Sequence, residues 1–399
     1  MTTTVPLESL VDPARPITYG IVLPGPEVPE GVPYVRVVDI KGGTILVEQL
    51  RRTTPEIAQS YRRSMLVEGD LVVSIRGHVG RTGVVPRAAS GANLTQDTAR
   101  VAIRPGAEPR FVRWFIESPT ARHWMAQHTK GVAVTGINLG DLRKLPVPDV
   151  PTAEQRRIAD ILDKADAVRR KRKEAIALTE ELLRSAFLEM FGDPVTNPKR
   201  WSVRSLDELD ADFSYGTSTK CTDDADEGRA VLRIPNVVGG QINYSDLKYA
   251  KLRDGEARQF LLASGDILFV RSNGNPNYIA RAAVFSGTSP MLFASYLIRA
   301  RLPSHCPALP EFVHAVFSTQ SFREQLLKEA TTTAGNYNIN TKGLGRQRIP
   351  LPPLQLQKRF VEVMERARAS RGQQERYGTV AEQLFNSLVA RAFSGGLSA

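Results

Sequence analysis

The chain has 399 residues, enough for two or three globular domains with cores of their own. Hydrophobic residues make up 42% and aromatic residues 7%, a composition that excludes a disordered chain, and no apolar run approaches the roughly 18 residues of a membrane span. The 53 basic and 42 acidic side chains give a net charge of +11, which favours a polyanion such as nucleic acid over an acidic protein as the partner.

Residues 1–150 are predicted to form a globular domain of mixed α and β structure. The apolar run at residues 71–75 is bounded by glycine and proline turn signals, which is typical of a strand. Residues 110–128 predict a helix, with Phe111, Phe115 and Trp124 among its apolar side chains.

A long helix is predicted next, within a spacer segment at residues 151–193. Residues 152–190 contain no proline or glycine, and Gly192 and Pro194 end the helix. Thr152 stands three residues before Gln155, a spacing typical of an N-cap whose glutamine bonds back to the cap. At about 1.5 Å per residue, roughly 39 residues give a rod of about 58 Å.

The second half repeats the first, with a globular domain at residues 194–349 and a second helical spacer at residues 350–399. Thr18-Tyr19-Gly20 returns as Ser214-Tyr215-Gly216, an offset of 215 − 19 = 196. Leu-Pro-Val-Pro at 145–148 returns as Ile-Pro-Leu-Pro at 349–352, an offset of 349 − 145 = 204. With four further matches in the same order, we infer one unit of about 200 residues used twice. The second copy carries a net insertion of about six residues between Phe285 and Asn338, and residues 266–270 and 310–330 predict its strand and helix.

The two helical spacers carry the same heptad of apolar side chains, displaced by 360 − 158 = 202 residues. Equal length and register favour pairing as an antiparallel coiled coil with the globular domains at opposite ends, whereas the alternative is that each helix packs only on its own domain. Gly372 and Gly378 should weaken the second helix by about 1 kcal/mol each. The predicted fold is α+β, with two tandem pseudo-symmetric globular domains separated by two long helices. The residues predicted to pair the helices or bind a partner are Ile158, Ile161, Leu162, Val168, Leu182, Leu183, Phe360, Val363, Leu384 and Leu388.

Groups for catalysis are largely absent from the sequence. It contains no Gly-Lys-Ser/Thr phosphate loop, no HExxH zinc motif and no EF-hand, and His123 and His128 are not spaced as a metal pair. Cys221 and Cys306 cannot build a disulfide framework or a zinc site of paired cysteines. Because residues 1–6 also lack an export signal, we expect a cytoplasmic protein without catalytic or metal-binding residues.

One tetrapeptide leaves an enzymatic alternative open. Asn275-Pro276-Asn277-Tyr278 resembles the Asn-Pro-Pro-Tyr loop with which adenine-N6 methyltransferases hold a flipped adenine. It lacks the second proline, and no Gly-x-Gly loop for S-adenosylmethionine follows a predicted strand. A surface turn is the simpler interpretation of these residues.

Loops at equivalent places in the two copies carry side chains suited to DNA. Arginine can hold guanine, and asparagine or glutamine can hold adenine, through paired hydrogen bonds, while threonine and lysine suit phosphates. Each residue alone is compatible with a solvated loop, yet the two sets fall in corresponding loops with different sequences, as two different half-sites require. The charge agrees, because residues 1–150 carry 18 − 14 = +4 and residues 194–349 carry 19 − 15 = +4. The predicted DNA-binding residues are Arg76, His78, Arg81, Asn93, Thr95, Gln96, Lys130, Thr135 and Asn138 in the first copy, and Arg271, Asn273, Asn275, Asn277, Tyr278, Arg281, Thr332, Asn336, Tyr337, Asn340 and Lys342 in the second.

Several stretches together resemble the specificity subunits of type I restriction-modification systems. They are Leu-Pro-Val-Pro at 145–148, EQRRIADILDKAD at 154–166, ELLRSAFLEMFGDP at 181–194 and the opening WSVRSL of the second domain at 201–206. The resemblance spans nearly the whole chain and is looser in the last helix, where Leu356 stands in place of Glu154.

The resemblance implies a non-catalytic subunit whose two target-recognition domains each read one half of a bipartite double-stranded DNA sequence. The helices would pair antiparallel, set the spacing between the half-sites and dock two modification subunits, which bind S-adenosylmethionine and methylate adenine. A restriction subunit that hydrolyses ATP with Mg²⁺ and cuts DNA would join this core. It follows that no cofactor is expected in this chain. A coiled-coil adaptor for proteins alone is a further alternative, against which the basic charge argues.

Overall fold

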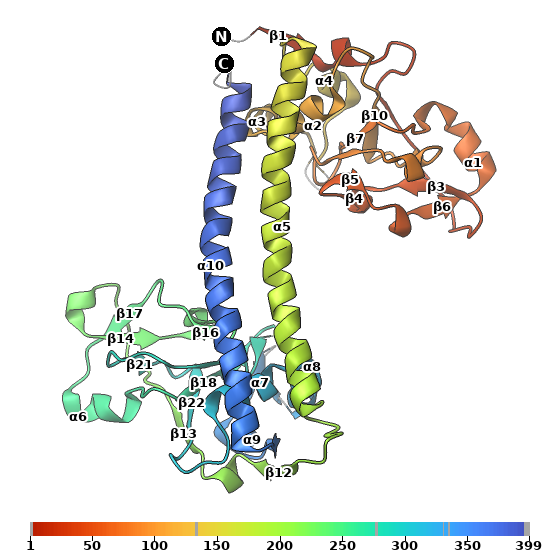
Figure 1. Cartoon of the computed structure of the whole chain (residues 1–399). Helices are drawn as coiled ribbons and strands as arrows, with labels where there is room; N and C mark the ends of the chain where they lie inside the picture. Colours follow the sequence, from red (N-terminus) through yellow and green to blue (C-terminus); the bar gives the residue numbers. More distant parts are fainter. Residues whose placement is uncertain (1–2, 132–134, 276–277, 330, 334–335, 395–399) are drawn as a thin grey trace. The chain divides into compact units, whose positions relative to one another are not determined.

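The computed structural model describes residues 3–131, 135–275, 278–329, 331–333 and 336–394 (Figure 1). The chain forms two compact units, which we call unit 1 (Met1–Glu174 and Glu375–Ala399) and unit 2 (Ala175–Gln374). Both boundaries fall inside the two long helices, α5 (Thr152–Phe191) and α10 (Leu354–Phe393). Each unit therefore contains one globular domain and half of each long helix.

Unit 1 is built on a six-stranded sheet in the order β2-β10-β7-β8-β5-β4 and a three-stranded sheet β6-β3-β9. The strand β7 is buried along its whole length, which explains its continuous apolar run. Its strands are β1 (Thr4–Pro6), β2 (Thr18–Tyr19), β3 (Val32–Val35), β4 (Ile40–Lys41), β5 (Gly43–Ile45), β6 (Arg51–Thr53), β7 (Leu71–Ser74), β8 (Thr82–Val84), β9 (Asn93–Leu94), β10 (Thr98–Val101) and β11 (Pro146–Pro148). Its shorter helices are α1 (Pro55–Ser60), α2 (Pro109–Glu117), α3 (Pro119–His128) and α4 (Leu139–Arg143).

Unit 2 has a four-stranded sheet β13-β22-β18-β20 and three-stranded sheets β17-β14-β21 and β19-β24-β23. Its strands are β12 (Ser202–Ser205), β13 (Asp212–Tyr215), β14 (Arg229–Leu232), β15 (Val237–Val238), β16 (Gln241–Ile242), β17 (Lys248–Ala250), β18 (Ile267–Val270), β19 (Ser272–Asn273), β20 (Ala282–Val284), β21 (Leu292–Phe293), β22 (Leu297–Arg301), β23 (Thr331–Thr333), β24 (Asn336–Asn338) and β25 (Arg348–Leu351). Its shorter helices are α6 (Asp254–Ala257), α7 (Pro310–Ser318), α8 (Gln320–Glu329) and α9 (Thr341–Gly345).

The two units repeat one topology, which confirms the tandem duplication. The order β2-β10-β7-β8 in unit 1 corresponds to β13-β22-β18-β20 in unit 2, and the antiparallel pair β1–β11 corresponds to β12–β25. The parallel pairing of β3 with β9 recurs as β14 with β21. Unit 2 adds β19, β23 and β24 where unit 1 has isolated bridges from Gly136 to Arg76 and Lys130, and β23 lies in the segment of the predicted insertion.

The helix predicted at residues 110–128 is in fact two helices, α2 and α3. The break lies at Ser118, whose extended backbone ends α2 and whose side chain accepts a hydrogen bond from the amide of Ala121 to cap α3. Pro119 then occupies the first position of α3, where a missing N–H group does no harm. The second copy breaks in the same way between α7 and α8, at Thr319, and Ala330 of its predicted helix lies outside the described residues.

The long helix α5 has the predicted extent, but its start is held differently from the prediction. Gln155 does not bond back to Thr152. Instead its side chain is buried, accepts from the amide of Glu108 at 2.9 Å and donates to the oxygen of Val150 at 2.9 Å. Gln357 repeats this arrangement at the start of α10, where it accepts from the amide of Leu309 at 2.9 Å. A buried glutamine thus fastens each long helix to the segment before α2 or α7.

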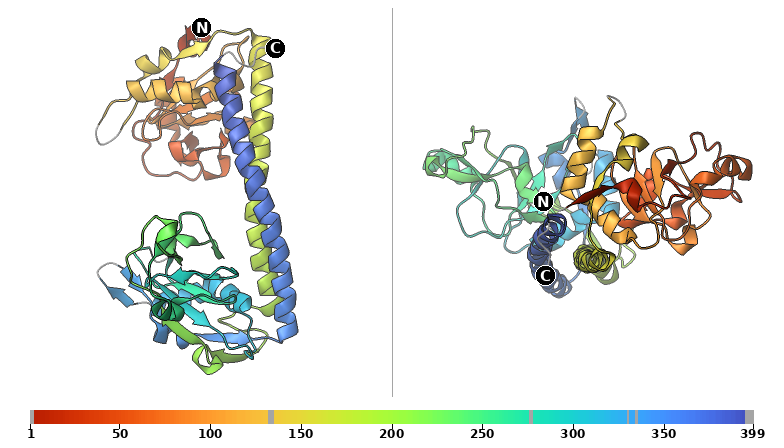
Figure 2. Two further views of the ribbon diagram at one scale, coloured as in Figure 1. Left: turned by 90° about the vertical axis from the view of Figure 1, so that its left-hand side faces the viewer. Right: turned by 90° about the horizontal axis from the view of Figure 1, so that it is seen from above.

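Within each unit the halves of α5 and α10 run antiparallel, as predicted. In unit 1 the early part of α5 lies beside the late part of α10 (Figure 2). Arg169 of α5 pairs there with Glu382 of α10 at 3.0 Å. In unit 2 the late part of α5 meets the early part of α10, and Glu180 pairs with Arg371 at 2.6 Å. Because 371 − 169 and 382 − 180 both equal 202, these two ion pairs are equivalent in the duplication.

The helix halves also complete the hydrophobic cores of the globular domains. Phe385 of α10 lies edge-on to Trp114 of α2, with ring centroids 5.4 Å apart, inside the core of unit 1. Phe187 of α5 lies 5.5 Å from Phe360 and 6.0 Å from Phe312 of α7 inside the core of unit 2. The alternative in which each helix packs only on its own domain is therefore wrong.

The heptad predicts the buried positions of the helices only in part. Ile158, Leu162 and Phe360 are buried, as expected of pairing residues, and Ile161, Leu183, Val363 and Leu388 are half-buried. Val168, Leu182 and Leu384 are instead 48%, 61% and 57% exposed, so a buried pairing position is wrong for these three. A straight helix turns once every 3.6 residues, so a 3.5-residue pattern drifts off the contact face along its length.

Candidate nucleic-acid interface

Aromatic and basic side chains meet at neighbouring strand ends in unit 2. Tyr215 ends β13, and Arg271, which directly follows β18, holds its guanidinium 4.7 Å from the centre of the Tyr215 ring. The amide of Arg271 donates to the oxygen of Tyr296 at 3.0 Å, and the Tyr296 side chain is 63% exposed. We call Tyr215, Arg271 and Tyr296 the unit 2 strand-end cluster.

The extra sheet of unit 2 begins directly beside this cluster. Asn273 in β19 pairs with Tyr337 in β24, which pairs in turn with Thr332 in β23. The amide of Ile339 donates to the oxygen of Arg271 at 2.9 Å, which ties the sheet to the cluster. The backbone thus brings together predicted residues that are some 60 positions apart in sequence (332 − 273 = 59). The side chains of Thr332 and Asn336 lie outside the described part of the structure, as does the whole of Asn277.

Unit 1 brings the corresponding loops together at the end of β7. The amide of Arg76 donates to the oxygen of Asp97 at 3.3 Å, and the amide of Gly77 donates to the oxygen of Thr135 at 3.0 Å. Arg76 and Lys130 both form bridges with Gly136. The predicted residues Arg76, Lys130 and Thr135 therefore lie at one place, next to the loop that carries Thr95 and Gln96.

The Arg76 loop itself is ordered by a buried serine. Ser74 donates to the oxygen of His78 and accepts from the amide of Arg81 at 2.8 Å, while the side chains of His78 and Arg81 stay exposed. The half-exposed Arg76 side chain lies 3.7 Å from the carboxylate of Asp97. A carboxylate beside the arginine sets unit 1 apart from the tyrosine-rich cluster of unit 2.

Three predicted DNA-binding asparagines have structural roles. Asn93 is only 1% exposed, accepts from Ser64 at 2.6 Å and donates to the oxygen of Tyr61 at 3.2 Å, so its prediction as a DNA contact is wrong. Asn138 and Asn340 cap helices α4 and α9, each accepting from a backbone amide at 2.8 Å. The Ile-Asn pair that the two copies share, at 137–138 and 339–340, therefore marks a repeated helix start.

Of the remaining predicted residues of unit 2, Asn275, Tyr278 and Arg281 lie between β19 and β23 in sequence, and Lys342 follows β24. Tyr278 stacks on Arg281, whose guanidinium lies 3.7 Å from the ring centre, and Asn275 is exposed. Lys342 is exposed on α9. Arg281 also lines a cavity of unit 2 that is described below.

The sequence-based prediction missed the tyrosines of the strand ends. Tyr215 and its counterpart Tyr19 stand out only through the repeated Tyr-Gly pair. The glycines are required by close backbone approach, because a Cβ atom on Gly20 or Gly216 would lie 1.8 Å or 2.1 Å from the backbone oxygen of Leu94 or Phe293. The repeated motif was therefore a signal for this place in the fold, and its exposed tyrosine could have been added to the predicted site.

The described residues hold no cluster of three or more histidine, cysteine, aspartate or glutamate side chains that could bind a metal ion. In the same part of the chain, no helix combines the length and apolar character that crossing a bilayer demands. Cys221 and Cys306 are both unpaired thiols, and burial raises the pKa of Cys306. What the strand ends present is guanidinium, phenol and amide groups, which can bind phosphates, base edges and base faces.

Comparison with known proteins gives matches to proteins of type I restriction-modification systems. Residues 26–178 match the family model described as the type I restriction modification DNA specificity domain. The chain is 30% identical over 216 residues to the type I restriction enzyme EcoBI specificity subunit of Escherichia coli, a match covering 52% of this chain and 44% of that protein. It is 25% identical over 307 residues to the EcoKI specificity subunit of Escherichia coli strain K12, covering 72% of this chain and 66% of that protein. The chain thus spans less than half of the first relative and just under two thirds of the second.

Two solved structures share the fold. The S subunit of a type I restriction-modification system from M. genitalium superposes with a TM-score of 0.59 at 14% identity and covers 98% of this chain and 96% of its own. A chain from a study of complex assembly in the type I system has a TM-score of 0.53 at 18% identity, with coverage of 99% and 98%. The sequence matches favour the predicted specificity subunit over the methyltransferase alternative. The chain is thus similar in sequence to the specificity subunits of type I restriction-modification systems, and it shares the fold of a solved S subunit.

Proposed function

We propose that this chain is the non-catalytic DNA-reading subunit of a type I restriction-modification complex, with each globular domain reading one half of a bipartite target. One observation carries the proposal: the same strand ends in the two units present different side chains. Arg271 and Tyr296 of unit 2 take the places of Ile75 and Asp97 in unit 1, as the matching amide-to-oxygen hydrogen bonds indicate. One scaffold with two different reading surfaces suits two unlike half-sites.

The long helices are proposed to set the half-site spacing and to dock two modification subunits. Support comes from two equivalent pairs of exposed leucine or valine side chains, Leu178 and Leu182 on α5 in unit 2 and Val380 and Leu384 on α10 in unit 1. The pairs are displaced by 202 residues, the offset of the duplication (384 − 182 = 202). Two equivalent apolar sites fit two copies of one partner.

Catalysis belongs, in this proposal, to the partner subunits. The modification subunits would supply S-adenosylmethionine, and a restriction subunit would supply ATP hydrolysis with Mg²⁺. The chain itself would need no cofactor for this role, and it would act in the cytoplasm, where the host DNA lies.

The test is DNA binding by the chain in complex with its modification subunits. Sequencing of methylated adenines in the host, with and without this chain, supplies the target sequence. Fluorescence anisotropy should then show tight binding only when both half-sites are present at the native spacing, with an affinity that falls steeply as salt rises. Equal binding to a duplex with one half-site scrambled would overturn the proposal.

The methyltransferase alternative has a separate test. The isolated chain is incubated with labelled S-adenosylmethionine and the target duplex, with the full complex as the positive control. We expect methyl transfer with the complex and none with the chain alone.

A further inference from the structure

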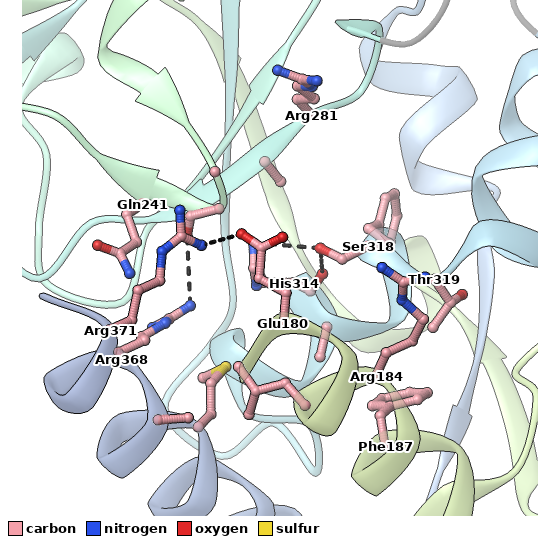
Figure 3. A pocket seen from close by; sticks show the side chains of 18 of the residues that line it. Glu180, Arg184, Phe187, Gln241, Arg281, His314, Ser318, Thr319, Arg368 and Arg371 are labelled. Atoms are coloured by element: carbon pink, nitrogen blue, oxygen red, sulfur yellow. Dashed lines mark hydrogen bonds and ion pairs between the residues drawn. The ribbon is translucent and has the colours of Figure 1, made fainter. Parts of the chain in front are cut away.

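A cavity of about 550 Å³ lies within unit 2, where the late part of α5 and the early part of α10 meet the globular domain (Figure 3). Arg184 and Phe187 of α5 lie on one side of it, and Arg368 and Arg371 of α10 lie on the other. His314, Ser318 and Thr319, from α7 and the residue after it, lie behind them. This volume is in the range of small-molecule sites.

The charge of the cavity is strongly positive. Five arginines line it, and Glu180 is the one carboxylate among its described lining residues. Glu180 pairs with Arg371 at 2.6 Å, which leaves an excess of four positive charges (5 − 1) over the acidic lining. Burial lowers the pKa of His314 to about 4, so this lining side chain is neutral at pH 7 and the charge comes from guanidinium groups.

In unit 1 three positions equivalent to the cavity lining carry larger side chains. Helices α2 and α7 are aligned by 310 − 109 = 201, so Trp114 corresponds to Ala315 and Arg113 to His314. Phe385, which packs on Trp114 in unit 1, corresponds to Leu183 in unit 2 (385 − 183 = 202). All three positions carry smaller side chains in unit 2, and all three line the cavity.

The electrostatics of the two places differ in the same direction. In unit 1 the buried Asp166 pairs with Arg169 at 2.6 Å and with Arg170 at 3.0 Å. Burial pulls the pKa of Arg169 down, but Asp166 and Glu382 outweigh it and the net pKa is raised. The first unit therefore neutralises its own arginines.

In unit 2 the position of this aspartate holds Arg368 (368 − 166 = 202). Arg368 donates to the backbone oxygen of Gly240 at 3.5 Å, and the described residues provide no ion pair for it. Burial lowers the pKa of Arg368 and outweighs the opposing charges of Glu311 and Glu365, neither of which forms an ion pair with it. An anionic ligand in the cavity would give this buried cation a direct partner.

We propose that this cavity binds a phosphorylated small molecule that has an apolar or aromatic part. Guanidinium groups bind phosphate oxygens through pairs of charged hydrogen bonds, and Arg184, Arg368 and Arg371 reach the cavity from two sides. Leu183, Phe187 and Met364 offer an apolar wall for the rest of the ligand. In unit 1 the matching positions are occupied by Trp114 and Asp166, so we expect the full chain to bind one ligand.

Isothermal titration of the full chain tests this proposal with three probes: ADP, inorganic pyrophosphate and adenosine. We expect one ADP per chain, pyrophosphate binding at least about threefold more weakly, and no heat from adenosine. Absence of binding by both ADP and pyrophosphate, or two ADP sites per chain, would overturn the proposal. Pyrophosphate binding as tightly as ADP would refute the apolar wall.

Two variants and a matched control locate the site. Ala315→Trp places in the cavity the side chain that unit 1 has and should abolish ADP binding without removing a charge. Arg184→Gln alters an exposed side chain that the core does not need and should weaken ADP binding about tenfold. Arg376→Gln, which removes an exposed arginine of α10 in unit 1, should leave ADP binding unchanged. Wild-type affinity in both cavity variants would contradict the assignment.

The last comparison separates the ligand from DNA. The complex that carries A315W or R184Q should bind its bipartite duplex within about twofold of wild type. A parallel loss of DNA affinity would mean that the cavity arginines bind DNA phosphates, and the small-molecule proposal would fall. The DNA-reading role tested above would be unaffected by failure of the ADP titration.

Discussion

Arg271 is the residue of the unit 2 strand-end cluster best placed for reading a base. Its guanidinium lies on the ring of Tyr215, and its Nη1 group donates to the oxygen of Ser295 at 3.4 Å, so the planar fork has a fixed orientation. A held fork loses less conformational entropy on binding than a free side chain does. In unit 1 the basic counterpart at the same edge is Arg76.

We predict that Arg271→Ala weakens binding of the complex to its bipartite duplex by about 1–3 kcal/mol and relaxes discrimination at one half-site only. Arg76→Ala should relax discrimination at the other half-site. Anisotropy with duplexes carrying single base changes in either half measures both effects. If both variants relaxed the same half-site, the assignment of one half to each unit would be wrong.

His314 makes the stability of unit 2 depend on pH. Its pKa is lowered to about 4 by burial and by the charge of Arg368, whereas an unfolded histidine titrates near 6.5. Between pH 6.5 and pH 4 the histidine is therefore protonated in the unfolded state but not in the folded state. The free energy of unfolding falls as the pH drops through this range. Between pH 7 and pH 5 this group alone should remove about 2 kcal/mol of stability.

The variant His314→Gln should lack that component. Urea unfolding of wild type and H314Q at pH 7 and pH 5 measures the difference, with the carboxylates contributing equally to both proteins. The loss of unfolding free energy should be about 2 kcal/mol smaller in H314Q. Parallel losses in the two proteins would mean that His314 is protonated in the folded state.

Residue types predicted which loops lie together better than they predicted the place of each side chain. Arg76 and Arg271 fall at converging strand ends, as their positions after apolar runs indicated. Asn93 is also polar and was expected in a loop, yet its side-chain amide is buried and makes hydrogen bonds inside the domain. It accepts from Ser64 and donates to backbone oxygens. Burial depends on which segments pack above a loop, and residue type does not carry that information.

At the scale of the elements, the long helices were predictable and their contacts were less so. The absence of proline and glycine over residues 152–190 located α5 to within one residue of its end. The break at Ser118 was missed because apolar periodicity continues across it. The apolar periodicity also predicted that Val168, Leu182 and Leu384 are buried between the two long helices, which is wrong. Each helix half packs against both the other helix and a globular domain, and this second contact widens and rotates its buried face.

The exposed leucines give the docking proposal a test at this scale. We predict that Leu182→Glu and Leu384→Glu each remove one of two modification subunits, because each places a charge in one of two equivalent apolar patches. Native mass spectrometry of the assembled complex counts the subunits. The controls Ser185→Glu and Ser387→Glu add the same charge at exposed positions of the same helices and should keep both subunits. Retention of both subunits by L182E and L384E would place docking elsewhere.

At the scale of the whole molecule, the sequence revealed the duplication because six short motifs keep their order, and the central strand order repeats in the two units. The way in which the two copies share their helices was not readable. Each unit takes half of its helix pair from the other copy: Phe385 completes the core of unit 1, and Phe187 that of unit 2. A heptad pattern predicts that two helices pair, but it does not predict which globular domain each helix end packs against. That depends on where the folded domains place Trp114, which contacts Phe385, and Phe312, which contacts Phe187.

Because each globular domain packs on helix residues from the other copy, we predict that a substitution in one copy of the sequence destabilises the domain of the other copy. Phe385→Ala, in the second copy of the sequence, should destabilise unit 1 by about 3–5 kcal/mol, and Phe187→Ala, in the first copy, should do the same to unit 2, since both side chains are buried. Hydrogen exchange followed by mass spectrometry should then show lost protection in β7 and α2 for F385A, and in β18 and α7 for F187A. Leu384→Ala is the matched control, because the neighbouring side chain is exposed and its removal leaves no cavity. If F385A instead loosened β18 and α7, the late part of α10 would belong to the domain that precedes it in sequence, and the exchanged-helix arrangement of the two units would be wrong.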